Sequence, residues 1–116
     1  MNKALSLLGL ARKAGRVAVG GEAVSGVLYQ GTARLVLTAS DAAKNTMRRL
    51  VGHEEVKHIS LPYTKEELGE ALGYKSCSIA AVCDAGFAKA FISAYDKQQN
   101  IDKLAKATNQ TGVSGI

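Results

Sequence analysis

Apolar residues follow two alternating patterns along this chain. In the longer segments they recur every three or four positions, which is the period of a helix with one buried face. The short segments between them are β-branched apolar runs, typical of buried strands. The first pattern predicts helices over residues 3–14, 22–30, 41–51, 64–72 and from 84 onward. The second predicts strands over residues 16–19, 34–38, 56–61 and 78–83. This alternation favours an α/β fold, a three-layer α/β/α sandwich with a four-stranded mixed sheet.

Residues that cap helices mark where three of these helices begin. Thr64 and Glu67 have the spacing of a capping box, in which each side chain accepts a backbone N–H of the other residue. Asp84 is placed to cap the last helix. Ser40 and Asp41 are predicted to cap the third helix in the same way.

The length of 116 residues is that of one domain. Residues 1–99 contain the whole alternating pattern and are predicted to form that domain. Residues 100–116 turn polar and rich in Gly, Ser and Thr, which predicts a flexible C-terminal tail. The apolar run after Lys3 is followed at once by Arg12 and Lys13, without an Ala-x-Ala site, so we do not expect a secretory signal. No apolar run approaches the ~20 residues of a transmembrane helix.

Basic residues are concentrated in the first half of the chain. The protein has 15 Lys and Arg against 10 Asp and Glu, a formal net charge of +5. Residues 1–49 hold eight basic and two acidic residues, whereas residues 50–116 hold seven basic and eight acidic ones. This asymmetry points to a polyanion, either a nucleic acid or an acidic membrane surface, facing one side of the fold.

Residues with common catalytic or metal-binding chemistry are few and scattered. His53 and His58 have no obvious Cys or Asp partner in the sequence, and Cys77 and Cys83 fit neither a CxxC motif nor a zinc pair. We expect the two cysteines to be buried, reduced thiols, which suits the cytoplasm. No nucleophile elbow, HExxH or P-loop motif occurs. The sequence therefore predicts no enzyme, no catalytic residue, no metal and no cofactor.

A strand–glycine–helix turn at Gly20 and Gly21 is the best candidate for binding an anion. Glycines at a helix N-terminus expose backbone N–H groups where the helix dipole favours negative charge. One basic cluster, which would approach this turn if the first helix returns beside it, consists of Arg12, Lys13 and Arg16. A second basic cluster consists of Lys44, Arg48 and Arg49. Each cluster has an ordinary solvated helix face as its alternative interpretation.

Six short stretches support a family resemblance. They are residues 8–16 (LGLARKAGR), 20–22 (GGE), 31–37 (GTARLVL), 40–42 (SDA), 67–73 (ELGEALG) and 84–88 (DAGFA). In this order and spacing the chain resembles the kink-turn-binding ribosomal protein superfamily (L7Ae/L30e), most of all its bacterial YlxQ-like branch. The resemblance implies an α/β/α sandwich, in agreement with the element pattern, and RNA binding without catalysis.

The resemblance also implies where RNA would be read. Members of the superfamily insert the turn before the second helix into the sheared G·A pairs of a kinked RNA duplex. Their motif is Gly-x-(Asn or Lys)-(Glu or Gln)-x-x-(Lys or Arg). Aligned on Gly31, its glycine falls on Gly20. The other motif positions, and a further basic position, fall on Glu22, Ala23, Gly26 and Gln30. Because Ala and Gly have no group to read a base edge or neutralise a phosphate, we expect a degenerate kink-turn motif on a retained fold.

The loop before the last strand is a second RNA contact that the resemblance implies. In the family it holds a flipped-out nucleotide, and it maps to residues 73–76. Tyr74 would stack on a base and Lys75 would meet a phosphate. The alternative is an exposed tight turn with an ordinary tyrosine.

These observations predict a non-enzymatic, ribosome-associated protein that binds structured RNA, with no membrane partner. The predicted RNA-binding residues are Arg12, Lys13, Arg16, Gly20, Gly21, Glu22, Tyr74 and Lys75. The alternative is a protein-interaction module on the same fold that has lost specific RNA binding. A domain that binds a small ligand or a nucleotide at the Gly20–Gly21 turn is a third, more distant interpretation. The oligomeric state is left open by the sequence.

Overall fold

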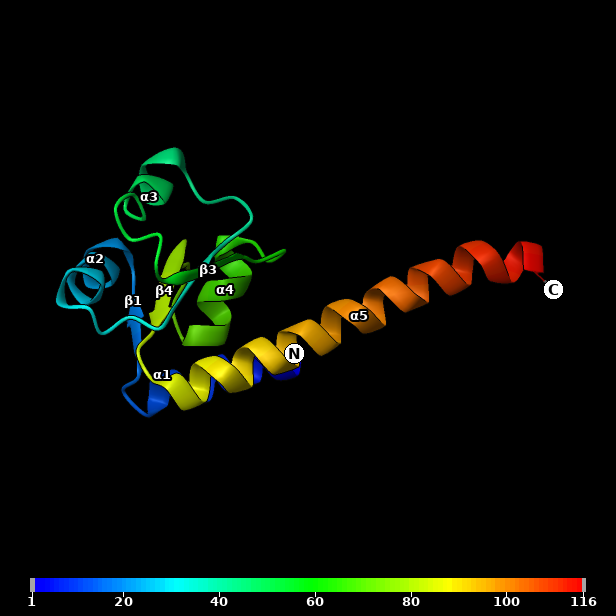
Figure 1. Ribbon diagram of the computed structural model, residues 1–116, viewed down its shortest axis with the longest axis horizontal. Coiled ribbons are helices and arrows are strands. Elements are labelled where there is room, and N and C mark those ends of the chain that lie inside the picture. Colours follow the sequence, from blue (N-terminus) through cyan, green and yellow to red (C-terminus); the bar gives the residue numbers. More distant parts are fainter. Residues whose placement is uncertain (1, 116) are drawn as a thin grey trace.

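In the computed structural model the elements follow one another in the predicted helix–strand order (Figure 1). The structure describes the backbone of residues 2–115 and the side chains of residues 2–100. The helices are α1 (Lys3–Lys13), α2 (Gly21–Gln30), α3 (Lys44–Arg48), α4 (Lys65–Leu72) and α5 (Ala85–Gly115). The strands are β1 (Val17–Val19), β2 (Leu35–Thr38), β3 (Lys57–Ser60) and β4 (Ile79–Val82).

The four strands form one mixed sheet in the order β1-β4-β2-β3. Strands β2 and β3 are parallel, whereas β4 runs antiparallel to both of its neighbours, β1 and β2. The central position of β4 explains its short, fully apolar sequence, because both of its faces are covered by helices. The predicted mixed sheet is therefore confirmed.

Two buried clusters lie on opposite faces of the sheet. On one face, α1, α4 and α5 pack together, and Leu8, Leu68 and Phe91 are almost fully buried among them. On the other face, α2 buries Val24 and Leu28 against the sheet. Figure 1 shows α1 and the first part of α5 side by side along one edge of the molecule, with α2 and α3 away from them. This arrangement confirms the three-layer α/β/α sandwich.

Ser40 and Asp41 do not cap the third helix, so that prediction is wrong. The N-cap of α3 is Ala43, which makes no side-chain capping hydrogen bond. The Ser40 N–H instead donates to the carbonyl of Tyr63 at 2.8 Å, which holds this segment beside the start of α4. There Asp41 Oδ1 accepts the N–H of Lys65 at 2.9 Å. The carboxylate therefore satisfies a free N–H group in the first turn of α4.

The other two predicted caps are confirmed. The hydroxyl of Thr64 accepts the Glu67 N–H and the Glu67 carboxylate accepts the Thr64 N–H, so the capping box is complete. Asp84 Oδ2 accepts the Phe87 N–H at 2.8 Å at the start of α5. The backbone of α5 remains helical to Gly115 and so includes most of the segment predicted as a tail. The side chains of residues 101–116 lie outside the described residues, and the domain boundary at residue 99 stays a prediction.

A close approach between α4 and the loop before β4 requires glycine at position 69. A Cβ atom added to Gly69 would lie 2.5 Å from the Cα atom of Ser76 and 2.8 Å from its backbone N and C atoms. The Tyr74 N–H donates to the Gly69 carbonyl at 2.8 Å, and the Cys77 N–H donates to the Lys65 carbonyl at 2.8 Å. The loop is therefore pressed onto α4 by backbone contacts.

We expect Gly69→Ala to destabilise the protein by about 1–3 kcal/mol, because the new methyl group overlaps backbone that has no free rotation. The matched control is Gly26→Ala in α2, where an added Cβ would meet no atom within 4 Å. That substitution should stabilise the protein by about 0.5–1 kcal/mol, since it removes a glycine from a helix interior. Urea unfolding of both variants measures the difference, and equal effects would contradict the close approach at Gly69.

Protonation of His58 should destabilise the fold. His58 Nε2 and the buried Thr38 Oγ1 are joined by a 2.8 Å hydrogen bond between β3 and β2, and partial burial lowers the pKa of the imidazole below its ordinary value of 6.5. The unfolded chain therefore binds this proton more readily, so the free energy of unfolding should fall as the pH drops below about 6.5. Urea unfolding at pH 7.5 and 5.5 should show a smaller drop for His58→Gln than for wild type.

Candidate functional site

The turn between β1 and α2 is fixed by glycine at two neighbouring positions. Gly20 has φ of 92°, a conformation that side chains disfavour, and its N–H donates to the Ile79 carbonyl of β4 at 3.0 Å. Gly20 is also the N-cap of α2 and provides no side chain to cap the helix. The N-terminus of α2 therefore lies at the edge strand β1 without a side-chain cap on its free N–H groups, and such groups favour an anion.

A surface cavity of about 370 Å³ lies between this turn, α3 and the loop before β4. Its lining includes Gly20, Gly21, Thr46, Arg49, Tyr74 and Ser76. Two of the predicted site segments, the glycine turn and the Tyr74 loop, thus face the same hollow although they are more than 50 residues apart in sequence. Tyr74 is 46% exposed, so its ring is available to a ligand at the edge of this cavity.

Arg12, at the end of α1, lies over the ring of Tyr74. Its guanidinium carbon lies 5.2 Å from the centroid of the Tyr74 ring, within the range of a cation–π contact. Arg12 and Lys13 also line a neighbouring cavity of about 300 Å³ between α1 and α4. The end of α1 therefore brings the positive charge of Arg12 beside the tyrosine, and the role of Arg12 and Lys13 in RNA binding stays a prediction.

Arg16 is not brought to the glycine turn. It precedes β1, whereas Gly20 follows that strand, so about 13 Å of extended chain separates them at 3.3 Å per residue. The Arg16 carbonyl accepts the Cys83 N–H at 2.8 Å, which fixes this residue at the far end of β4. Glu22 is exposed in the first turn of α2, and Lys75 is exposed next to Tyr74.

Arg49 belongs to this surface although sequence analysis did not connect it with the turn. It is the C-cap residue of α3, and its Nη1 donates to Ser25 Oγ of α2 at 2.8 Å. Its guanidinium lies against Gly21, where an added Cβ would be 2.5 Å from Arg49 Nε. In the sequence, the second glycine of the Gly20–Gly21 pair was the available signal for this contact. A glycine often marks a place where another group approaches the backbone closely.

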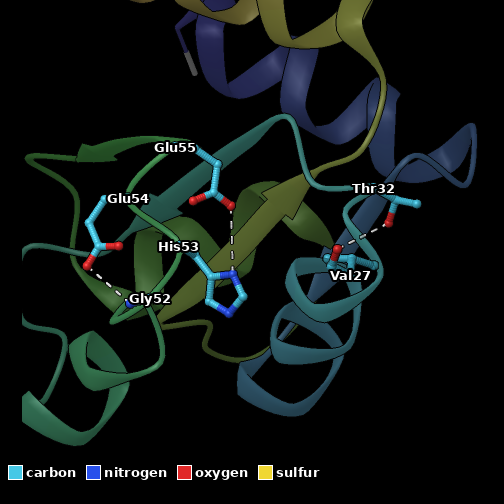
Figure 2. Close-up of polar contacts among 6 residues, drawn as sticks. All are labelled: Val27, Thr32, Gly52, His53, Glu54 and Glu55. Carbon is cyan, nitrogen blue, oxygen red and sulfur yellow. Dashed lines mark hydrogen bonds and ion pairs between the residues drawn. The ribbon is translucent and has the colours of Figure 1, made fainter.

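The acidic residues after α3 are turned toward their own loop, as Figure 2 shows. Among the side chains of residues 2–100, the one ion pair is His53 Nδ1 with Glu55 Oε1, at 4.0 Å. Glu54 Oε1 accepts the Gly52 N–H at 3.1 Å, and this hydrogen bond lowers the pKa of the Glu54 carboxyl. Arg12 and Arg49 therefore have no carboxylate partner in the described part of the chain.

The two cysteines differ in burial, and Cys77 is among the residues that line the 370 Å³ cavity. Cys77 is buried, Cys83 is half-buried, and both are free thiols whose pKa values are raised by burial. Within residues 2–100, His, Cys, Asp and Glu do not gather in a group of three or more that could hold a metal ion. Over the same described residues, no helix is long and apolar enough to span a membrane.

Residues 2–92 match a protein family described as the ribosomal protein L7Ae/L30e/S12e/Gadd45 family. The chain belongs to this family. Over 94 residues it is 35% identical to the RNA-binding protein YlxQ of Bacillus subtilis (strain 168), covering 78% of this chain and 92% of that one. A YlxQ protein of Enterococcus faecium is 31% identical over 90 residues, covering 75% of this chain and 85% of the relative. These similarities confirm the YlxQ-like branch expected from the sequence.

Solved structures agree with the family fold. A protein of unknown function from Bacillus halodurans superimposes with a TM-score of 0.75 at 31% identity, over 83% of this chain and 99% of that chain. The 15.5kD RNA binding protein of Giardia lamblia superimposes with a TM-score of 0.64 at 19% identity, over 80% of this chain and 82% of that chain. The second likeness supports the fold alone. The α/β/α sandwich is thus common to this chain and to solved structures at 31% and 19% sequence identity.

The contact between Arg12 and Tyr74 should be measurable as a coupling free energy. We expect a double-mutant cycle of Arg12→Ala and Tyr74→Ala to give a coupling of about 0.5–1 kcal/mol in urea unfolding, the range for an exposed cation–π pair. The cycle of Arg16→Ala with Tyr74→Ala is the matched control, because it removes the same charge from the far end of β1. Its effects should add within about 0.3–0.5 kcal/mol. Equal coupling in the two cycles would contradict the contact.

Proposed function

We propose that this protein binds structured RNA, without catalysis, through the surface around the β1–α2 turn. We call it the turn surface and define it by Arg12, Lys13, Gly20, Gly21, Glu22, Tyr74 and Lys75. The observation that supports it best is that Tyr74, with Arg12 over its ring, lines one cavity together with Gly20 and Gly21 at the N-terminus of α2. Relatives at 31–35% identity are named RNA-binding proteins, which supports the same class of ligand.

Each part of the turn surface has a distinct use in holding RNA. Arg12 and Lys13 provide positive charge for phosphates, and the exposed Tyr74 ring provides a face on which an unpaired base can stack. Glu22, Ala23 and Gly26 occupy the exposed face of α2, and of these only Glu22 has a polar side chain. The binding free energy should therefore come mainly from phosphate contacts and stacking, with a degenerate reading of kink-turn bases.

A binding titration across a salt series tests this proposal. It compares a labelled kink-turn RNA with a plain duplex of equal length. Phosphate-led binding predicts affinity for both RNAs that falls steeply as salt rises. Tight binding to the kink-turn alone would show that base reading survives the changes in α2. Absence of binding to either RNA at low salt would overturn the proposal. Association with ribosomes in the cytoplasm is the setting that we propose, and sedimentation with ribosomal subunits in a cell extract tests it.

The basic end of α1 gives the sharpest mutational test. We expect Arg12→Ala combined with Lys13→Ala to weaken binding to both RNAs, with each lost phosphate contact reducing the slope of log K against log salt by about 0.7–0.9. Arg16→Ala should bind as wild type does, because Arg16 lies at the other end of β1. A double variant that binds like wild type, or an equal loss in Arg16→Ala, would show that the turn surface is not the RNA contact.

A protein-interaction module on the same fold is the second candidate function. It is favoured by the apolar and uncharged groups on α2, where Tyr29 is 90% exposed close to the uncharged Ala23 and Gly26. This candidate predicts a defined protein partner that co-purifies with the chain after nuclease treatment. It also predicts no RNA binding at low salt, so the RNA titration separates the two functions.

A further inference from the structure

Arg49 occupies an unusual position for an exposed arginine. It leaves α3 and lies across the first turns of α2, where it fills the space that a side chain at Gly21 would need. A Cβ at Gly21 would be 2.5 Å from its Nε, 2.7 Å from its Cζ and 3.0 Å from its Nη2. The hydrogen bond from Nη1 to Ser25 Oγ, 2.8 Å long, holds one edge of the guanidinium in this place. The contact with Gly21 and the hydrogen bond to Ser25 together hold the guanidinium of Arg49 beside the turn surface.

The charge of Arg49 is not neutralised by the residues around it. No carboxylate contacts it within the described residues 2–100, and Glu54 and Glu55 bind Gly52 and His53 instead. A guanidinium has five N–H donors, and only one donates to Ser25. The other N–H donors of Arg49 can reach a ligand, because this residue is exposed and lines the 370 Å³ cavity.

The rest of the cavity suits an anion with oxygen acceptors. Hydroxyl-bearing residues Thr46, Ser76 and Ser78 line it together with Arg49. A guanidinium donates two parallel hydrogen bonds to phosphate more effectively than an ammonium group does. The guanidinium of Arg49, the hydroxyl groups and Tyr74 thus line one hollow.

We propose that Arg49 binds an RNA backbone phosphate at this cavity, so that the RNA-binding surface extends from α1 and α2 onto α3. This inference rests on the proposed RNA-binding function and adds a residue of a different element to it. The phosphate would receive hydrogen bonds from the donors that Ser25 does not use. A nucleotide whose base stacks on Tyr74 would have its phosphate within the same cavity.

Neighbouring arginines provide a matched experiment. Arg48 precedes Arg49 directly, is also exposed and has the same charge, but its Nη1 donates to Asn45 Oδ1 at 2.9 Å and it lines a different surface hollow. We expect Arg49→Ala to weaken binding to the labelled RNAs about tenfold relative to Arg48→Ala, the loss typical of one charge-assisted hydrogen bond. The slope of log K against log salt should fall by about 0.7–0.9 in Arg49→Ala alone. Far-ultraviolet circular dichroism and urea unfolding check that both variants fold.

A second variant separates lost charge from lost structure. Gly26 follows Ser25 on α2 and has open space around it, so a long side chain fits there. In the Arg49→Ala background, Gly26→Lys should restore most of the lost affinity, because a long, flexible lysine one residue after Ser25 returns a cation to α2 near the place of the lost guanidinium. Gly26→Gln should not, although it also replaces the glycine with a better helix former. Equal recovery with lysine and glutamine would show that Arg49 acts by stabilising α2.

The outcomes distinguish the inference from the proposed function. If wild type binds RNA and the Arg48→Ala and Arg49→Ala variants bind equally well, the inference is wrong and the RNA-binding function stands. If wild type binds neither RNA at low salt, the proposed function fails and the role of Arg49 fails with it. A tenfold difference between the two variants, rescued by Gly26→Lys, supports both.

Discussion

The contact of Gly69 with the backbone of Ser76 determines where the candidate site can form. Since no side chain separates them, α4 and the loop before β4 touch through their backbones. Hydrogen bonds from the N–H groups of Tyr74 and Cys77 to carbonyls of α4 fix the loop at both ends. The loop cannot move without loosening α4, so Tyr74 is held at a constant place relative to β4. Because Gly20 donates to Ile79 of the same strand, the glycine turn and the tyrosine share one rigid frame.

The positive charge beside this frame comes from the ends of two helices and not from the strands of the sheet. Arg12 comes from the end of α1 and Arg49 from the end of α3. Both arginines lie against uncharged groups, a tyrosine ring and a glycine of α2, and neither has a carboxylate partner among residues 2–100. Two arginines without carboxylate partners beside this frame cost some folding free energy through their repulsion, which water screens at exposed positions. Because the fold does not neutralise their charge, both guanidinium groups can attract an anionic ligand.

Local signals were sufficient for the order of the elements but not for the contacts between them. Hydrophobic periodicity predicted every helix and strand, and the capping spacing at Thr64 predicted the start of α4, because both depend on residues within one turn or one strand. The errors involve pairs distant in sequence. Asp41 accepts the N–H of Lys65 in α4, and Arg49 donates to Ser25 in α2. Each of these pairs is 24 residues apart in the sequence. The position of Arg16 depended on the direction of β1, which periodicity does not give. The site was thus predictable as a set of segments, and its geometry required the packed fold.

A side chain that attracts a phosphate can lie farther from its target than a side chain that forms hydrogen bonds with a base. A hydrogen bond to a base edge needs a donor or acceptor about 3 Å away in a defined direction, so Ala23 and Gly26 cannot be replaced by groups on another helix. The attraction of a cation to a phosphate extends over the Debye length of about 8 Å, so an arginine from α3 can act beside α2. On the proposed surface, therefore, phosphate contacts can be redistributed among α1, α2 and α3 while base contacts at α2 cannot.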